Sequence, residues 1–444
     1  MRIVAARDGG LCRIRLPGGA LSADAADAIA QAALAHASGV IEATNRANLQ
    51  IRGVRPGEQR ALIERLLAAG LGPAGTFGAA GIAANAQSAE TAETAETAET
   101  AETAQHPANP AADDVRNLML SPTAGRDRAA LIDTLPLAEA ILALLRDEPR
   151  FAALSPKFAL QLDGGEQLTM LGHPHDIWLA ALPAADGPCF AFGLAGCAPV
   201  APHDPPALAA VRPADVPALV RALLHAFVDL ATPEMTRMRD LLAERPAEAL
   251  LAHAAARGGF ALLRDPQIAA WRRSPARAAL RFGVQPQRSP GLSHVGAQPP
   301  LGRLAAASLR ALATLAREAG SGMLRVTPWQ SVLLPDVPER NAQAALGYIG
   351  QQHALPAAGA PDCLRGFVRL CERPRRHQIR CNASRARSAI ASGSAFKRLH
   401  ALVRGRASGA VHAARHRAGS LRSVPARRGA LAASRTGLRP VYCP

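Results

Sequence analysis

Two segments that lie far apart in the chain show the same helical spacing of apolar residues. Residues 26–39 read ADAIAQAALAHASG, and residues 309–322 read LRALATLAREAGSG. In both segments Ala, Leu or Ile recurs at helical spacing and a glycine follows the last turn. This pattern predicts two amphipathic helices that each end at a glycine cap.

The similarity continues beyond the helices into two pairs of predicted strands. Residues 39–54 (GVIEATNRANLQIRGV) align with residues 322–337 (GMLRVTPWQSVLLPDV) at an offset of 283 positions. The matched positions are Gly39 with Gly322, Ile41 with Leu324, Thr44 with Thr327, Leu49 with Val332, Ile51 with Leu334, and Val54 with Val337. Each unit reads as helix, glycine turn, strand, threonine-containing turn and strand. We therefore expect two similar α+β halves, paired about a pseudo-twofold axis.

The segment between the two halves has a different order of patterns, which predicts a separate α+β domain. Helical periodicity is clear at residues 135–149 and 215–231. Short apolar runs typical of strands lie at residues 156–166, 175–182 and 189–196. Before this segment, residues 89–103 are five copies of AET, which have no apolar face and predict a flexible linker.

The end of the chain differs from the rest in charge. Residues 362–444 contain 19 of the 51 Lys and Arg but only two of the 35 acids, which leaves 32 basic and 33 acidic residues elsewhere. The excess charge of +16 is therefore a property of the tail, and its composition predicts disorder. The tail contains few aromatic residues and no nucleic-acid-binding motif, so nucleic acid is not the favoured partner.

Cysteine spacing and apolar runs argue against a secreted or membrane protein. The seven cysteines are odd in number and irregularly spaced, which is not the pattern of a disulfide framework. The first residues contain no apolar segment typical of a secretion signal, and no run of about 18 apolar residues predicts a membrane span. We expect a cytoplasmic protein.

Four motifs occur in a defined order: TNRANLQIRGV, VRNLMLSPTAG, SPKFALQLDGG and RVTPWQSVLLPD. Together with the internal repeat, this order resembles the sulfite/nitrite reductase superfamily, and within it most resembles the precorrin-3B synthase branch. The resemblance covers about residues 8–340 apart from the AET copies, and it implies an α+β fold. The implied parts are a ferredoxin-like half domain (1–71), a linker (72–111), a reductase-type α+β domain (112–270), a second ferredoxin-like half domain (283–340) and a basic tail (341–444).

The resemblance implies a groove that binds a tetrapyrrole through its carboxylates. By motif position, Arg46, Arg116 and Lys157 match basic active-site residues of the family, and Gln50 and Arg52 lie on the strand that follows Arg46. Arg and Lys are the residue types that carboxylates require. Each of these side chains could instead be a solvated charge or a loop cap. The order of the motifs favours a binding site.

Two further features of the sequence bear on the chemistry of the site. Sulfite reductases usually have a second basic residue two places after the lysine, where this chain has Ala159. That loss favours a branch in which the tetrapyrrole itself is the substrate. His173 and His175 have no third metal ligand nearby, so a turn is favoured over a metal site.

The precorrin-3B synthase branch implies an oxygenase that converts precorrin-3A to precorrin-3B with O₂, by ring hydroxylation and γ-lactone formation. It also implies a [4Fe-4S] cluster, a non-haem iron and electrons from NADH through a reductase. The family holds its cluster on C-x5-C and C-x3-C motifs, because these clusters need thiolate ligands. In this chain Cys363, Cys371 and Cys381 are spaced C-x7-C-x9-C, which does not match.

A shift of the reading frame by one base explains the missing motif. Read one base later, the codons of Leu364 and Leu370 can each encode cysteine, with five residues between them. We therefore expect the chain to leave its frame between about Val337 and Asp362 and this copy to be impaired. Two alternatives stay open: a sirohaem-dependent sulfite or nitrite reductase relative, and a non-catalytic protein with a nucleic-acid-binding tail.

Overall fold

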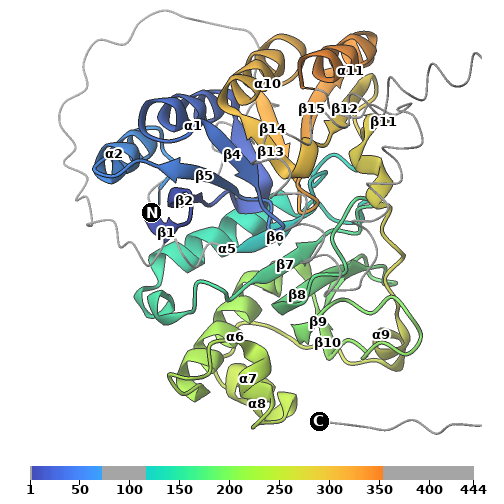
Figure 1. Ribbon diagram of the computed structural model, residues 1–444. Helices are drawn as coiled ribbons and strands as arrows, with labels where there is room; N and C mark the ends of the chain where they lie inside the picture. Colours follow the sequence, from blue (N-terminus) through green and yellow to red (C-terminus); the bar gives the residue numbers. More distant parts are fainter. Residues whose placement is uncertain (1–2, 73–116, 354–444) are drawn as a thin grey trace, which may run out of the picture. The chain divides into compact units, whose positions relative to one another are not determined.

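The computed structural model describes residues 3–72 and 117–353, and within these ranges it contains three five-stranded sheets (Figure 1). Arg116, the AET copies and the predicted tail after residue 353 lie outside the described residues. Among the described residues, no helix combines the length and the apolar character that a membrane crossing requires.

The first half domain is an antiparallel sheet with two helices that pack on one face. Its elements are β1 (Ile3–Ala6), β2 (Gly9–Ile14), η1 (Pro17–Gly19), β3 (Ala20–Ser22), α1 (Ala23–His36), β4 (Val40–Ala43), β5 (Leu49–Val54) and α2 (Gln59–Ala68). The Ser22 hydroxyl starts α1 by accepting a hydrogen bond from the N–H of Ala25 at 3.1 Å. Ile29 of α1 and Leu62 of α2 are fully buried in the core against the sheet.

The second half domain repeats this order. Its elements are β11 (Gly283–Pro286), β12 (Leu292–Ala297), η6 (Pro300–Gly302), β13 (Arg303–Ala305), α10 (Ala306–Ala319), β14 (Met323–Val326), β15 (Val332–Pro338) and α11 (Glu339–His353). Helices α1 and α10 lie side by side, and apolar residues from both halves form a single core (Figure 1). The two α+β halves predicted from the repeat are confirmed.

Each half domain donates one short strand to the sheet of the other. The strand orders are β1-β2-β5-β4-β13 and β11-β12-β15-β14-β3, so β13 completes the first sheet and β3 completes the second. The N–H of Ala306 donates to the Gly39 carbonyl at 2.9 Å, and the N–H of Ala23 donates to the Gly322 carbonyl at 2.8 Å. This reciprocal exchange follows the pseudo-twofold relation and makes each half depend on the other.

The turn between the last two strands is the same in both halves. Ala47 and Gln330, which are 283 positions apart, both have left-handed backbones, with φ of 56° and 63°. The Thr44 hydroxyl accepts a hydrogen bond from the N–H of Asn48 at 3.2 Å, and the Thr327 hydroxyl accepts one from the N–H of Ser331 at the same distance. The threonines matched in the sequence therefore have the same structural role.

The strand exchange leaves no room for a side chain at Gly19. Its φ is 72°, and an added Cβ would lie 2.0 Å from the Val326 carbonyl oxygen of the other half. We expect Gly19→Ala to destabilise the protein through the left-handed strain, about 1–2 kcal/mol, and in addition through this clash. Gly57→Ala is the matched control, because Gly57 has φ of 86° but no atom within 4 Å of an added Cβ. Equal losses for the two variants in chemical denaturation would contradict the described packing.

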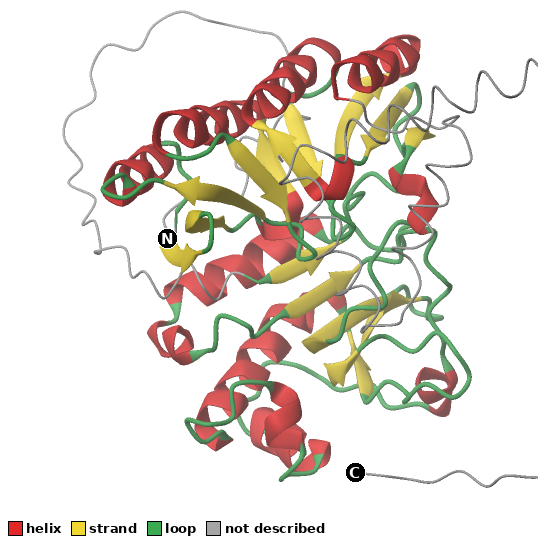
Figure 2. Cartoon of the chain, in the orientation of Figure 1, coloured by secondary structure: helices red, strands yellow, loops and turns green. Residues whose placement is uncertain are grey.

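The central domain has a mixed sheet of order β10-β9-β8-β7-β6, with most of its helices on one face and one short helix, α9, in a separate apolar cluster (Figure 2). The strands are β6 (Leu118–Leu120), β7 (Leu160–Asp163), β8 (His175–Leu182), β9 (Cys189–Gly196) and β10 (Ala209–Val211). The helices are α5 (Leu135–Asp147), η3 (Pro149–Ala153), η4 (Pro213–Asp215), α6 (Val216–Leu230), α7 (Met238–Leu242), α8 (Ala247–Ala255) and α9 (Pro266–Ala270). Strands β6, β7 and β8 are parallel, which places their amino ends at one edge of the sheet.

The predicted domain boundary at residue 340 is too early. Helix α11 continues to His353, and its Ala342, Ala345 and Ile349 are buried in the core of the half domains. These residues are spaced three and four positions apart, so they lie on one face of α11, and this face packs against the core. Residues 341–353 therefore belong to the second half domain and not to a basic tail.

A buried cluster of charged side chains lies at the end of β7. Asp163 accepts two hydrogen bonds from Arg273, 2.6 Å from Nε and 3.2 Å from a terminal nitrogen. Glu166 is fully buried beside Asp163, and one of its oxygens accepts a hydrogen bond from the N–H of Gly164 at 2.7 Å. Burial raises the pKa of the Glu166 carboxyl, and the negative charge of Asp163 raises it further. The uncharged form of Glu166 is thus favoured to higher pH than in an ordinary glutamate.

The raised pKa of Glu166 makes stability fall as the solution becomes more alkaline. Between the ordinary glutamate pKa of 4.5 and the higher pKa in the folded protein, the folded state binds more protons than the unfolded state. We expect the free energy of unfolding of Glu166→Gln not to show this decrease with pH. Over this pH range, it should rise relative to that of the wild type by at most about 1.4 kcal/mol per pH unit. Urea unfolding at a series of pH values tests this, and parallel pH profiles would refute it.

Candidate functional site

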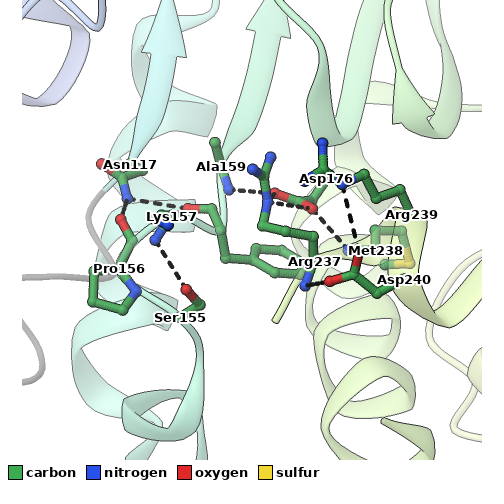
Figure 3. A network of polar contacts seen from close by, with 11 residues as sticks. Asn117, Ser155, Pro156, Lys157, Ala159, Asp176, Arg237, Met238, Arg239 and Asp240 are labelled. Carbon is green, nitrogen blue, oxygen red and sulfur yellow. Dashed lines mark hydrogen bonds and ion pairs between the residues drawn. The ribbon is translucent and has the colours of Figure 1, made fainter. Parts of the chain in front are cut away.

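The amino ends of β6, β7 and β8 bring together several polar residues of the central domain. Asn117 precedes β6, Lys157 precedes β7, and Asp176 lies at the start of β8 (Figure 3). Lys157 is exposed, and its backbone N–H donates to the Ser155 hydroxyl at 3.2 Å. The predicted residue Arg116 is not described, but its neighbour Asn117 lies at this edge of the sheet.

Asn117 joins the first half domain to the loop that contains Lys157. Its side-chain amide donates to the carbonyls of Pro156 at 2.6 Å and Phe158 at 3.1 Å (Figure 3). Arg15, which follows β2, donates to the Asn117 side-chain oxygen and, at 3.3 Å, to the Pro156 carbonyl. Hydrogen bonds from both sides thus fix the backbone around Lys157.

Asp176 is a second point of attachment for the same loop. Only 1% of this residue is exposed. Its carboxylate accepts hydrogen bonds of 2.8 Å from the N–H of Ala159 and from the N–H of Met238, and it forms an ion pair of 2.9 Å with Arg237 (Figure 3). Burial raises the pKa of Asp176, while these hydrogen bonds and the charge of Arg237 oppose the shift. Asp176 therefore joins β7, β8 and the start of α7.

Arg46 approaches this edge from the first half domain, on the turn between β4 and β5. It is partly buried, and burial lowers the pKa of its guanidinium, as do the positive charges of Arg237 and Arg13, while Asp176 has the opposite effect. Among the described residues, no hydrogen bond or ion pair engages the Arg46 side chain. The structure thus brings Arg46 to the edge where Lys157 lies.

Two histidines lie against the same cations. Burial lowers the pKa of His173, and the charge of Arg46 lowers it further. His175 is 3% exposed, and its pKa falls to about 3 through burial and the neighbouring His173 and Arg46. Both rings are therefore uncharged near neutral pH and leave the arginines and Lys157 as the positive groups of the site.

Gln50 and Arg52 lie on the sheet face of the first half domain that is turned away from the helices, and both have partners there. Gln50 donates to Glu42 at 2.6 Å, and Arg52 forms an ion pair of 2.8 Å with Asp8. The register of the strands aligns Gln50 with Arg13 on one side and Glu42 on the other. Asp8 neutralises the charge of Arg52, and Glu42 engages Gln50. The role of Gln50 and Arg52 in ligand binding therefore stays a prediction.

The described residues do not supply a set of ligands for an iron–sulfur cluster. Cys12 lies in the core of the half domains, and Cys189 lies in a smaller apolar cluster of the central domain. Residues 3–72 and 117–353 contain no group of three or more His, Cys, Asp or Glu that could hold a metal ion. Cys363, Cys371, Cys381 and Cys443 lie outside these ranges.

Two sequence-family models match the chain. Residues 5–69 and 285–351 match the nitrite/sulfite reductase ferredoxin-like half domain, and residues 111–257 match the nitrite and sulphite reductase 4Fe-4S domain. The chain belongs to the nitrite/sulfite reductase family. This assignment confirms the predicted arrangement of two ferredoxin-like half domains around a reductase-type domain.

Similar proteins include ferredoxin–nitrite reductases. The chloroplastic enzyme of Zea mays is 29% identical over 81% of this chain and 59% of its own length. The enzyme of Synechococcus elongatus is 30% identical over 80% of this chain and 65% of its own length. The chain therefore spans less than two thirds of these relatives. The solved structure of the Mycobacterium tuberculosis NirA protein has the same fold, with a TM-score of 0.57, 22% identity, and coverage of 78% of this chain and 57% of that chain.

The sequence did not identify Arg237 and Asp176 as site residues. Asp176 lies in residues 175–182, which were predicted only to form a strand, and Arg237 lies in no recognised motif. Their contact joins the start of β8 to the residue before α7, and the two residues are 61 positions apart in the chain. A signal in the sequence was the group of polar residues His173, His175 and Asp176 at the start of β8.

Proposed function

We propose that this chain is an oxidoreductase of the nitrite/sulfite reductase type that binds an anionic tetrapyrrole at the edge formed by Arg46 and Lys157. The observation that carries the proposal is the convergence of cations from two domains around a single buried acid. Arg13, Arg46 and Arg237 interact electrostatically close to Asp176, and Lys157 lies two residues before Ala159, whose N–H donates to the same carboxylate. A ligand with several carboxylates would balance the excess positive charge.

Sirohaem, a tetrapyrrole with many carboxylates, fits this set of donors better than an uncharged cofactor. Arg46 and Lys157 would hold its acidic groups, and the bound iron would supply the electron-transfer chemistry for reducing a small oxyanion. The names of the ferredoxin–nitrite reductases support nitrite as the oxyanion and a ferredoxin as the electron donor. Asp176 would keep the Lys157 loop in place through the N–H of Ala159.

A second candidate is the precorrin-3B synthase-like oxygenase, and one observation favours it. The position two residues after Lys157 is occupied by the buried Ala159, whose side chain has no ionisable group, so this position contributes no cation to the site. The reduction of a small oxyanion needs positive charge beside the reacting oxygen atoms. A tetrapyrrole substrate needs positive charge only around its periphery, where its carboxylates lie. The oxygenase would use precorrin-3A and O₂ and would take electrons from NADH through a partner reductase.

We further infer that the reading frame changes after residue 351. The match to the half domain extends to residue 351, and the buried side of α11 extends to Ile349. An out-of-frame segment would not be expected to continue a helix with core-facing apolar residues at helical spacing. Sequencing of the gene and its transcript across codons 351–362 tests this inference, and an intact frame there would refute it.

The two candidate activities can be separated with the purified full-length chain. Sirohaem is added, its absorption band is followed on the protein fraction, and nitrite consumption is measured with a chemically reduced viologen dye. A bound sirohaem band supports the reductase proposal, with or without turnover of nitrite by this copy. Absence of sirohaem binding, together with conversion of precorrin-3A in the presence of O₂, would refute it in favour of the oxygenase.

A further inference from the structure

The Arg237 side chain is held rigidly at the edge of the candidate site. Its backbone N–H donates to Asp240 at 3.0 Å, and its Nε donates to the two carboxylate oxygens of Asp176 at 3.0 and 2.9 Å (Figure 3). The side chain of Arg237 is 15% exposed. Both ends of this residue are thus fixed, and its guanidinium has one orientation.

The two terminal nitrogens of Arg237 have unused hydrogen-bonding capacity. Within the part of the chain that the structure describes, every hydrogen bond of its guanidinium comes from Nε. A guanidinium has a fixed fork of N–H donors that matches the two oxygens of a carboxylate. Arg237 can therefore pair with Asp176 on one side and still donate to a ligand.

The neighbours of Arg237 indicate what such a ligand would be. Burial lowers the pKa of Arg46, and the positive charge of Arg237 lowers it further, while Asp176 opposes the shift. The Asp176 carboxylate is engaged by Arg237 and by two backbone N–H groups, so its single charge balances only one of the two arginines. A further anion would lower the cost of bringing these two arginines together. An extended apolar ligand or a cation would gain nothing from this arrangement.

We propose that Arg237 binds a carboxylate of the tetrapyrrole ligand and that Asp176 is the residue that positions it. This inference rests on the proposed function and adds a third ligand-binding cation, contributed by the segment before α7. The rival explanation is that Arg237 only neutralises the buried charge of Asp176. In that case its terminal N–H groups would have no role in ligand binding.

The test uses Arg237→Lys in the full-length chain, because lysine can still neutralise Asp176 but lacks the fork of donors. Uroporphyrin, a porphyrin with many carboxylates, is titrated by fluorescence, and mesoporphyrin, which has fewer, is the comparison ligand. We expect Arg237→Lys to weaken uroporphyrin binding about tenfold and mesoporphyrin binding much less. Arg239→Gln is the matched control, because Arg239 lies two residues away and its side chain is 72% exposed.

The outcomes separate this inference from the proposed function. Unchanged uroporphyrin binding by Arg237→Lys, alongside weakened binding by Arg46→Gln, would overturn the role of Arg237 and leave the proposed function intact. Failure of the wild-type chain to bind uroporphyrin would overturn both. An equal loss for both porphyrins, with a lower melting temperature, would show that Arg237 has only a structural role. Preferential loss of uroporphyrin at an unchanged melting temperature is the expected result.

Discussion

Replacing Arg273 by methionine is expected to remove about 3–5 kcal/mol of the free energy of unfolding, the largest effect that we predict for a single substitution. The Arg273 side chain is 6% exposed and donates to Asp163, as well as to the carbonyls of Glu166 at 2.6 Å and Ser274 at 2.9 Å. Methionine would fill part of the space but leave the Asp163 carboxylate buried without its counter-charge. Chemical denaturation monitored by circular dichroism measures the loss.

Two further variants show whether the cause is the unpaired charge. In the double variant Arg273→Met with Asp163→Asn, the buried charge is absent, so we expect a smaller loss than for Arg273→Met alone. Arg146→Ala removes an ion pair of 2.7 Å with Asp147 in which the arginine side chain is 40% exposed. Its expected cost is at most about 1 kcal/mol. A loss below about 1 kcal/mol for Arg273→Met would contradict the buried pair.

Replacing Arg46 by glutamine is expected to weaken binding of an anionic tetrapyrrole by a factor of about 10 to 100. Hydrogen bonds to charged groups contribute about 1.5–3 kcal/mol, and the partly buried position of Arg46 limits screening by solvent. The readout is the dissociation constant of uroporphyrin from fluorescence quenching. The melting temperature should change little, because no hydrogen bond or ion pair of the Arg46 side chain occurs within the described ranges.

The control for Arg46→Gln is the removal of another charge from the same half domain. Arg60 is on α2, its side chain is 91% exposed, and it pairs with Glu64 on the same helix. Arg60→Gln lowers the net charge by the same amount, but we expect no change in uroporphyrin affinity. If the two variants weaken binding equally, the effect is one of overall charge, and Arg46 does not contact the ligand.

The predicted fold came from patterns that are local in the sequence. Apolar positions in residues 26–39 and 309–322 repeat with a helical period, and the structure has α1 and α10 there. The threonine-containing turns also matched, because backbone shape at Ala47 and Gln330 depends mainly on nearby hydrogen bonds. The predicted boundary at residue 340 left α11 out of the second half domain, although its buried residues have helical spacing, because the chain was expected to leave its reading frame from about Val337.

Local sequence patterns were enough to predict the repeat, the order of the folded parts, and two candidate cations, Arg46 and Lys157. Which charges are matched depends on contacts between elements that are distant in the chain. The tertiary structure pairs Arg52 with Asp8 and fixes Arg237 on Asp176. It also exchanges β3 and β13 between the half domains. The physical reason is that periodicity specifies which face of an element is buried, whereas the partner of a charge or a strand edge depends on where distant elements meet.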